Sequence, residues 1–254
     1  MVRAVTVFVA ILLLAYVALC AALFAWQRSL LYFPQPKSWG SPATTMQLQV
    51  KDAELVLTAR QAAGPKAIVY FGGNAEDVSA NLPSFAAAFP GHAIYLLHYR
   101  GYGGSSGSPT EAALQSDALA LFDQVSKIHA EVTVVGRSLG SGVAVWVASQ
   151  RPVSRLILVT PYNSIQELAA QRFPYFPIAW LLVDKFESWK YAPKVTAPTL
   201  LIAAGQDELI PAASTGKLLT QFKPGTAALK VLPGTSHNTI SQHPQYLSLF
   251  QSML

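Results

Sequence analysis

A chain of 254 residues is long enough for one catalytic domain and an appendage. Its net charge of +5 comes without a run of Lys or Arg, which argues against a nucleic-acid-binding protein and fits a mild attraction to anionic lipid. Cys20 is the only cysteine, so an intramolecular disulfide and a cysteine metal site are both excluded. The domain must therefore be stabilised by its hydrophobic core.

The N-terminal segment is apolar throughout. Residues 4–26 contain no charged side chain, and about 20 apolar residues are enough to cross the hydrocarbon core of a bilayer as a helix. Trp26 beside Arg28 is typical of a membrane interface. We therefore predict that residues 1–28 are a membrane anchor and that the protein is a single-pass membrane protein.

Two alternatives to an uncleaved anchor remain open. A cleaved signal peptide would be processed near Ala18-Leu19-Cys20, although its apolar core would usually be shorter, and Cys20 could serve as a lipoprotein cysteine. The side of the membrane is also open, because Arg3 lies on one side of the segment and Arg28 and Lys37 lie on the other.

The rest of the chain alternates short apolar strands with helices. Residues 29–45 contain several prolines and read as a linker, and residues 46–254 as one domain that opens with a hairpin around Lys51-Asp52. The alternation predicts a mostly parallel, doubly wound sheet. The strand over residues 67–71 runs into Gly72-Gly73-Asn74, and we expect Asn74 to cap a helix that continues to Ala88.

The residues 132–142 carry the strongest chemical signal. A β-branched strand leads into Gly136-Arg137-Ser138-Leu139-Gly140, and an apolar helical segment follows. Strand, sharp turn and helix are the context of a nucleophile elbow, in which glycines two residues either side of the serine avoid a collision. We predict Ser138 as the nucleophile and the backbone N–H of Leu139 as an oxyanion donor.

A serine nucleophile needs a histidine base, and the base needs a carboxylate to orient it. Asp207 and His237 each follow a predicted strand, and the carboxyl ends of parallel strands meet at one edge of a sheet. We predict them as the acid and the base, with Glu208 as the alternative carboxylate. The backbone N–H of Asn74 is the predicted second oxyanion donor, unless its loop is only a tight turn. No metal or cofactor is expected.

Five motifs together resemble the Bem46-type branch of the α/β-hydrolase superfamily: residues 71–76, 99–105, 136–142, 205–207 and 234–238. The resemblance covers the chain from about residue 45 onward, and it implies the α/β-hydrolase fold, a frequent N-terminal membrane helix and acyl ester or thioester hydrolysis. Two positions depart from a frequent form of the pattern. Gly72 stands where many members carry His, and His98 stands where many carry Asp, which affects the polarity of the pocket rather than the triad.

The segment of residues 164–191 falls where the superfamily places a cap over the nucleophile. Its aromatic residues are candidates for lining a substrate pocket or a lid: Phe173, Tyr175, Phe176 and Trp180. An apolar lid for an acyl chain is one interpretation, and a helix packed on the sheet is the other.

The sequence thus predicts a membrane-anchored serine hydrolase that acts on an acyl ester or thioester of a lipid or a lipidated protein. It predicts the bilayer as a partner and no nucleic acid. A peptidase or acyltransferase with the same triad, and a catalytically silent binding protein with this fold, are the alternatives.

Overall fold

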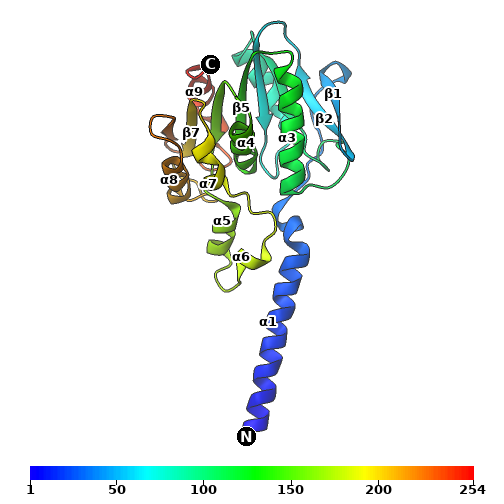
Figure 1. Ribbon diagram of the computed structural model, residues 1–254, viewed down its shortest axis with the longest axis vertical. Coiled ribbons are helices and arrows are strands. Elements are labelled where there is room, and N and C mark those ends of the chain that lie inside the picture. Colours follow the sequence, from blue (N-terminus) through cyan, green and yellow to red (C-terminus); the bar gives the residue numbers. More distant parts are fainter.

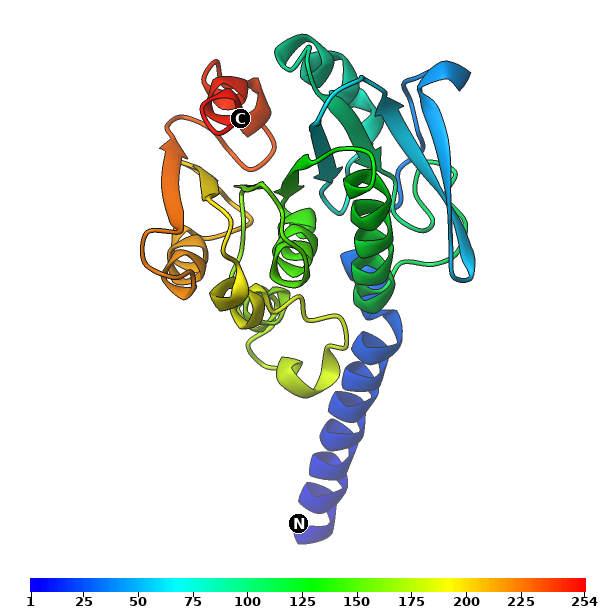
Figure 2. The same ribbon diagram turned by 45° about the horizontal axis from the view of Figure 1, so that its top comes forward.

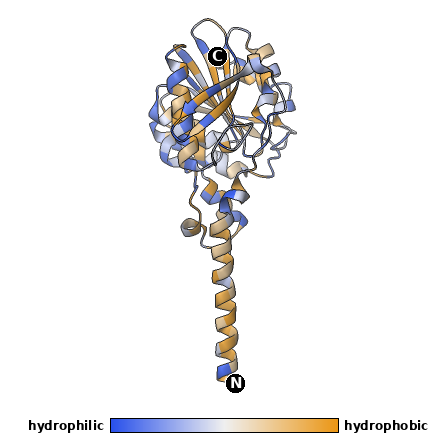
Figure 3. Ribbon diagram, turned by 90° about the vertical axis from the view of Figure 1, so that its right-hand side faces the viewer, coloured by the Kyte–Doolittle hydropathy of each residue, from blue (hydrophilic) through white to orange (hydrophobic).

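The computed structural model describes all 254 residues as a catalytic domain on one long helix (Figure 1). Helix α1 spans Val2–Leu31 and leaves the domain as a stalk, and no residue in it is buried. It is the one helix long and apolar enough to cross a membrane. In Figure 3 its residues are mostly hydrophobic from near the N-terminus until hydrophilic residues appear next to the domain.

The domain is built on a sheet of eight strands in the order β1-β2-β4-β3-β5-β6-β7-β8. The β1–β2 and β2–β4 pairs are antiparallel, and all other neighbours are parallel. The strands are β1 Thr45–Val50, β2 Ala53–Arg60, β3 Lys66–Phe71, β4 Ala93–Leu97, β5 Glu131–Arg137, β6 Arg155–Val159, β7 Thr199–Ala204 and β8 Ala227–Leu232. The predicted hairpin is β1–β2, and Asp52 in its turn has a positive φ of 61°.

Helices cover both faces of the sheet (Figure 2). Alternate residues of the central strand β3 point into two cores: Val69 and Phe71 into one, Ile68 and Tyr70 into the other. The first core is closed by α3 Glu111–Ser126, α4 Leu139–Gln150 and α8 Ala212–Gln221, and the second by α2 Leu82–Ala88 and α9 Tyr246–Gln251. A mostly parallel sheet with both faces covered is the predicted architecture.

Two segments differ from the sequence-based expectation. Residues 33–44 are not a free linker: they lie against the domain, with Gly103 donating its N–H to the Gln35 carbonyl and Ser38 donating to Asp77. The helix after β3 does not start at Asn74 either. Its first turn is a 3₁₀ helix, Val78–Asn81, which Asp77 caps by accepting from the Ser79 N–H. Asn74 is thereby left in the loop.

The cap inserted between β6 and β7 contains α5 Ile165–Arg172, α6 Ile178–Leu181 and α7 Ser188–Tyr191. Helix α7 packs on α4, whereas α5 and α6 extend away from the sheet on the side from which α1 leaves (Figure 1). The cap therefore lies between the catalytic domain and the long helix.

Candidate active site

Ser138 occupies the turn between β5 and α4, as the motif predicts. Its backbone has φ 48° and ψ −118°, a strained conformation for a residue with a side chain. A Cβ added to Gly140 would lie 2.1 Å from the Phe71 carbonyl oxygen, and one added to Gly136 would lie 2.3 Å from the Gly140 oxygen. The two glycines are therefore required because the turn brings backbone against backbone.

His237 lies between Ser138 and Asp207. Its Nε2 is 3.0 Å from the Ser138 hydroxyl oxygen, and its Nδ1 is 3.0 Å and 3.1 Å from the two Asp207 oxygens. His237 is buried, with 5% of the residue's surface exposed. Three residues far apart in the sequence thus form a continuous hydrogen-bonded chain at the carboxyl ends of β5, β7 and β8.

The carboxylate next to the histidine ring is Asp207 and not Glu208. Burial raises the pKa of the Asp207 carboxyl, but hydrogen bonds from His237 and from the N–H groups of Ile210 and Leu209 outweigh it, so its pKa lies below the usual value. Glu208 instead accepts a hydrogen bond from the backbone N–H of His237 at 3.1 Å. The two neighbouring acids hold the histidine from two sides.

Two backbone N–H groups are available beside Ser138. Leu139 begins α4, so its N–H has no partner within the helix, and the Asn74 N–H also donates no hydrogen bond to another protein atom. A cavity of about 440 Å³ opens over Ser138. Its walls are formed by Phe33, Gly73, Asn74, Ala75, Glu76, Arg137, Ser138, Leu209, His237 and Asn238.

Glu76 and Arg137 are site residues that the sequence reasoning missed. One Glu76 oxygen accepts from the Gly73 N–H at 2.7 Å and the other from the Tyr70 hydroxyl at 2.7 Å, and Arg137 lies 3.7 Å from the same carboxylate. Arg137 also donates to the His237 carbonyl at 3.3 Å. Both residues stand inside the quoted motifs, but a motif does not show which loops its variable positions will join.

Phe33 is the third missed residue. It follows the end of α1, its N–H donates to the Asn74 carbonyl at 3.0 Å, and it forms part of the cavity wall. The Asn74 side chain in turn donates to the carbonyl of Leu31, the last residue of α1, at 2.9 Å. The long helix is therefore joined directly to the loop that carries the predicted oxyanion donor.

The four aromatic cap candidates are not gathered at Ser138. None of them lines the cavity over the serine, and Tyr175 and Trp180 are 85% and 87% exposed. Phe173 lines a different, apolar pocket between the cap and α1. The interpretation in which these side chains pack on the sheet does not describe the structure.

His98 is a buried core residue. Its Nε2 lies 2.9 Å from the Thr58 hydroxyl, and the ring fills the space that a Cβ on Gly103 would need. Burial lowers the pKa of His98 to about 4, so the ring is neutral at pH 7. His98 thus occupies its position as an uncharged group.

The family model described as alpha/beta hydrolase fold matches residues 66–186. The uncharacterized protein Rv2307c of Mycobacterium tuberculosis is 33% identical over 247 residues, with 89% of this chain and 86% of that protein covered. Protein bem46 of Schizosaccharomyces pombe is 26% identical, covering 74% and 72%. Lysophosphatidylserine lipase ABHD12 of Danio rerio is 28% identical, covering 82% of this chain and 63% of that protein.

Solved structures agree on the fold. The Pyrococcus furiosus esterase Pf2001 superposes with a TM-score of 0.68 at 15% identity, covering 88% of this chain and 96% of that one. At that identity the likeness concerns the fold alone. The relatives, the matched family model and the sheet agree with the resemblance inferred from the motifs. The chain belongs to the Bem46-like branch of the α/β-hydrolase family of serine hydrolases.

Proposed function

We propose that this protein is a membrane-anchored serine hydrolase that cleaves acyl esters or thioesters through an acyl-enzyme. One observation carries the proposal. Ser138, on a strained turn, is hydrogen-bonded to His237, and His237 is hydrogen-bonded to Asp207, at 3.0 Å for each link. The lipase named among the relatives favours an acyl lipid over a small soluble ester as the substrate class.

The mechanism follows from the protons and the charges. Nε2 of His237 takes the Ser138 proton as the oxygen attacks the acyl carbonyl, and Asp207 fixes the tautomer and stabilises the imidazolium that forms. The Leu139 and Asn74 N–H groups donate to the oxyanion, and each such donor lowers the barrier by about 2.7–4 kcal/mol. The same imidazolium then protonates the leaving oxygen or sulfur.

Deacylation repeats these steps with water as the nucleophile. His237 removes a proton from the water, the oxyanion forms again in the same place, and Ser138 leaves with the proton that His237 returns. Helix α1 holds the domain at the membrane as a single-pass anchor, which keeps the enzyme at the surface where acyl lipids are concentrated.

The test is active-site labelling with a fluorophosphonate probe in membranes that contain the full-length protein. We expect labelling of the wild type, its loss in Ser138→Ala, and its retention in Ser141→Ala, a matched change at a buried serine in the first turn of α4. Labelling that survives in Ser138→Ala would refute the nucleophile assignment. A folded wild type that stays unlabelled would favour a silent binding protein.

Product identity separates the enzyme classes. A radiolabelled or fluorescent acyl ester should yield free fatty acid with wild type and none with Ser138→Ala. Transfer of the acyl group to an added alcohol in preference to water would indicate an acyltransferase, and cleavage of peptides but not esters would indicate a peptidase.

A further inference from the structure

The tip of the cap, residues 173–183, lies beside α1 well below the catalytic domain (Figure 1). The Tyr16 hydroxyl donates to the Tyr175 carbonyl at 2.8 Å, and the Tyr16 ring is stacked on Phe176 with centroids 5.8 Å apart. Tyr16 precedes Arg28 by 12 residues, which at 1.5 Å per residue places it about 18 Å further along the helix axis. The cap tip therefore reaches to mid-length of the apolar helix.

Along the helix axis, α1 and the cap change from charged to uncharged residues at the same level. Arg28 forms an ion pair with Asp184 at 3.1 Å at the end nearest the domain. Beyond that pair, residues 4–26 of α1 and residues 173–183 of the cap contain no charged side chain. If α1 spans a hydrocarbon layer of about 30 Å, the cap tip lies within the same layer.

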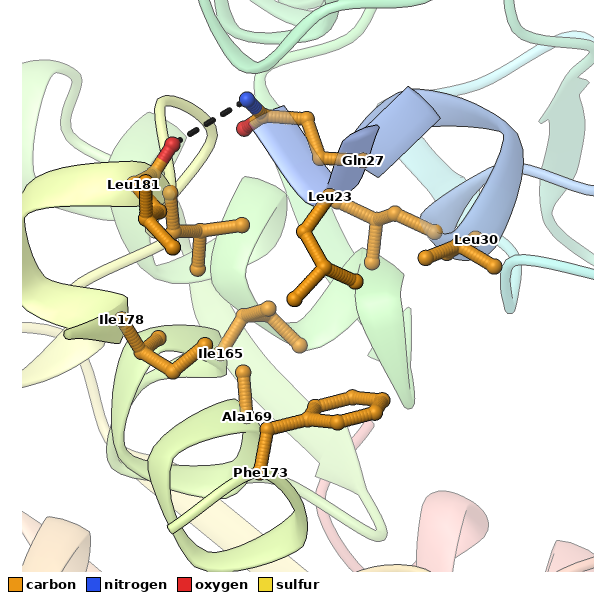
Figure 4. A pocket seen from close by; sticks show the side chains of 10 residues that line it. Leu23, Gln27, Leu30, Ile165, Ala169, Phe173, Ile178 and Leu181 are labelled. Atoms are coloured by element: carbon orange, nitrogen blue, oxygen red, sulfur yellow. Dashed lines mark hydrogen bonds between the residues drawn. The ribbon is translucent and has the colours of Figure 1, made fainter. Parts of the chain in front are cut away.

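Three polar backbone groups of the cap tip pair with α1 side chains, and the Ala179 carbonyl accepts from the Lys185 ammonium at 2.8 Å. The first is the Tyr16 bond to Tyr175. Gln27 donates to the Leu181 carbonyl at 3.1 Å (Figure 4), and it also accepts from the Val183 N–H at 2.7 Å. Non-helical backbone is tolerated at membrane depth only where protein satisfies it, because an unpaired group costs several kcal/mol there. Tyr175 and Trp180 are exposed, and each carries one polar group on a mainly apolar ring.

An apolar pocket of about 110 Å³ lies between α1 and the cap (Figure 4). Nine of its ten lining residues are hydrophobic, including Leu23 of α1 and Ala169 and Phe173 of the cap. Leu31 lines this pocket and Phe33, two residues later, lines the cavity over Ser138. The segment that ends α1 therefore forms a wall of both.

We propose that the cap tip is inserted in the bilayer against α1, and that the pocket between them receives the acyl chain of a membrane lipid that enters sideways. This inference rests on the proposed function and names its substrate as a bilayer-resident lipid with a long acyl chain. The chain would lie between Leu23 and Phe173 while the ester reaches Ser138. A short soluble ester would reach the serine without using the pocket.

The catalytic test fills the pocket in the full-length protein reconstituted in phosphatidylcholine nanodiscs. Ala169→Phe occupies the pocket, and Ala170→Phe, at an exposed neighbouring position of α5, is the matched control. The chain of a bilayer lipid is already in hydrocarbon, so the expected loss comes from blocking its entry into the pocket. The kcat/KM for a palmitoyl ester should fall roughly 10-fold or more in Ala169→Phe and stay near the wild-type value in Ala170→Phe. Hydrolysis of a butyryl ester should be unchanged in both variants.

Equal effects of Ala169→Phe on the two esters, or equal effects of the two variants, would overturn the pocket assignment. Ser138→Ala distinguishes this failure from failure of the proposed function, because it should abolish hydrolysis of both esters. If the butyryl activity depends on Ser138 but shows no chain-length effect in Ala169→Phe, only the lipid-entry proposal fails.

Insertion of the cap tip is tested without catalysis. The fluorescence of one tryptophan is the difference between the wild type and the variant that lacks it. In vesicles of phosphatidylcholine with brominated acyl chains, the Trp180 component, obtained from Trp180→Phe, should be strongly quenched relative to unbrominated vesicles. The Trp189 component, obtained from Trp189→Phe, should not be quenched. Trp189 lies on α7, which packs against α4, and serves as the control. No quenching of the Trp180 component would place the cap tip in water and overturn the insertion. Quenching of the Trp180 component no stronger than that of the Trp189 component would also overturn it, because the tip would then be no closer to the acyl chains than α7.

Discussion

At the scale of single residues, Glu76 is the side chain that shapes the loop next to the nucleophile. Glu76→Ala leaves the Gly73 N–H and Arg137 without their partner, whereas Glu76→Gln keeps an oxygen for Gly73. A displaced oxyanion donor costs up to about 2.7–4 kcal/mol, so we expect Glu76→Ala to lower kcat by 10- to 100-fold with little change in KM. Steady-state kinetics on a short ester measure this, and Glu76→Gln should recover most of the loss. A fall in thermal stability with unchanged kcat would mean that Glu76 is only structural.

A second prediction at the residue scale concerns His98 and the stability of the folded protein at acidic pH. Burial lowers its pKa to about 4 in the folded state, against about 6.5 unfolded, so the unfolded chain binds the proton more readily. Its contribution to stability is therefore present above pH 6.5 and is lost as the pH falls toward 4, by about 2 kcal/mol between pH 7 and pH 5. Urea unfolding of Ser138→Ala at the two pH values should show this loss, and adding His98→Gln should remove it. An unchanged difference between the two pH values would assign the acid sensitivity to other groups.

At the scale of elements, the end of α1 and the loop after β3 are held together by Asn74. Its side chain donates to the Leu31 carbonyl, and its own carbonyl accepts from Phe33 and Tyr102. Asn74→Ala retains the backbone N–H but removes one hydrogen bond, which contributes about 0.5–1.5 kcal/mol to holding the loop. We expect kcat on a short ester to fall about 2- to 10-fold, with KM unchanged.

Asn163→Ala, which removes an amide that donates to Glu167 on the cap, is the control for this change and should leave kcat near the wild-type value. If Asn74→Ala behaves like Asn163→Ala, the end of α1 does not position the loop. The outcome therefore decides whether the anchor helix is coupled to the site or only tethers it.

The sequence predicted the helices and strands better than it predicted which of them are in contact. Short apolar strands that end in polar residues were enough to bring Ser138, Asp207 and His237 to one edge, because parallel strands align their carboxyl ends. The direction of the cap was not predictable, since an apolar segment has the same composition whether it packs on a sheet or on a membrane helix. The contacts of Asn74 with Leu31 and Phe33 were missed for a related reason. A proline-containing segment after an apolar helix looks like a linker until the loop it covers is known.

At the scale of the whole molecule, the N-terminal helix contacts the cap through Tyr16, Gln27 and Arg28. Processing near Ala18-Leu19-Cys20 would remove Tyr16, leaving the Tyr175 carbonyl without its donor and Phe176 without its stacking partner. It would also cut the apolar run to a remnant too short to span about 30 Å of hydrocarbon.

We therefore expect the mature protein to keep residues 1–20 and to stay in the membrane fraction after alkaline carbonate extraction. Intact mass spectrometry of the detergent-purified protein measures this directly. A chain that begins at Ala21 would indicate signal-peptide cleavage, and one that begins at Cys20 with added acyl mass would indicate a lipoprotein. Tyr16→Phe, which keeps the ring but removes the hydroxyl, should leave the mass pattern unchanged apart from the lost oxygen. Its thermal stability in nanodiscs should fall by the equivalent of about 0.5–1.5 kcal/mol, because the Tyr175 carbonyl loses its hydrogen bond.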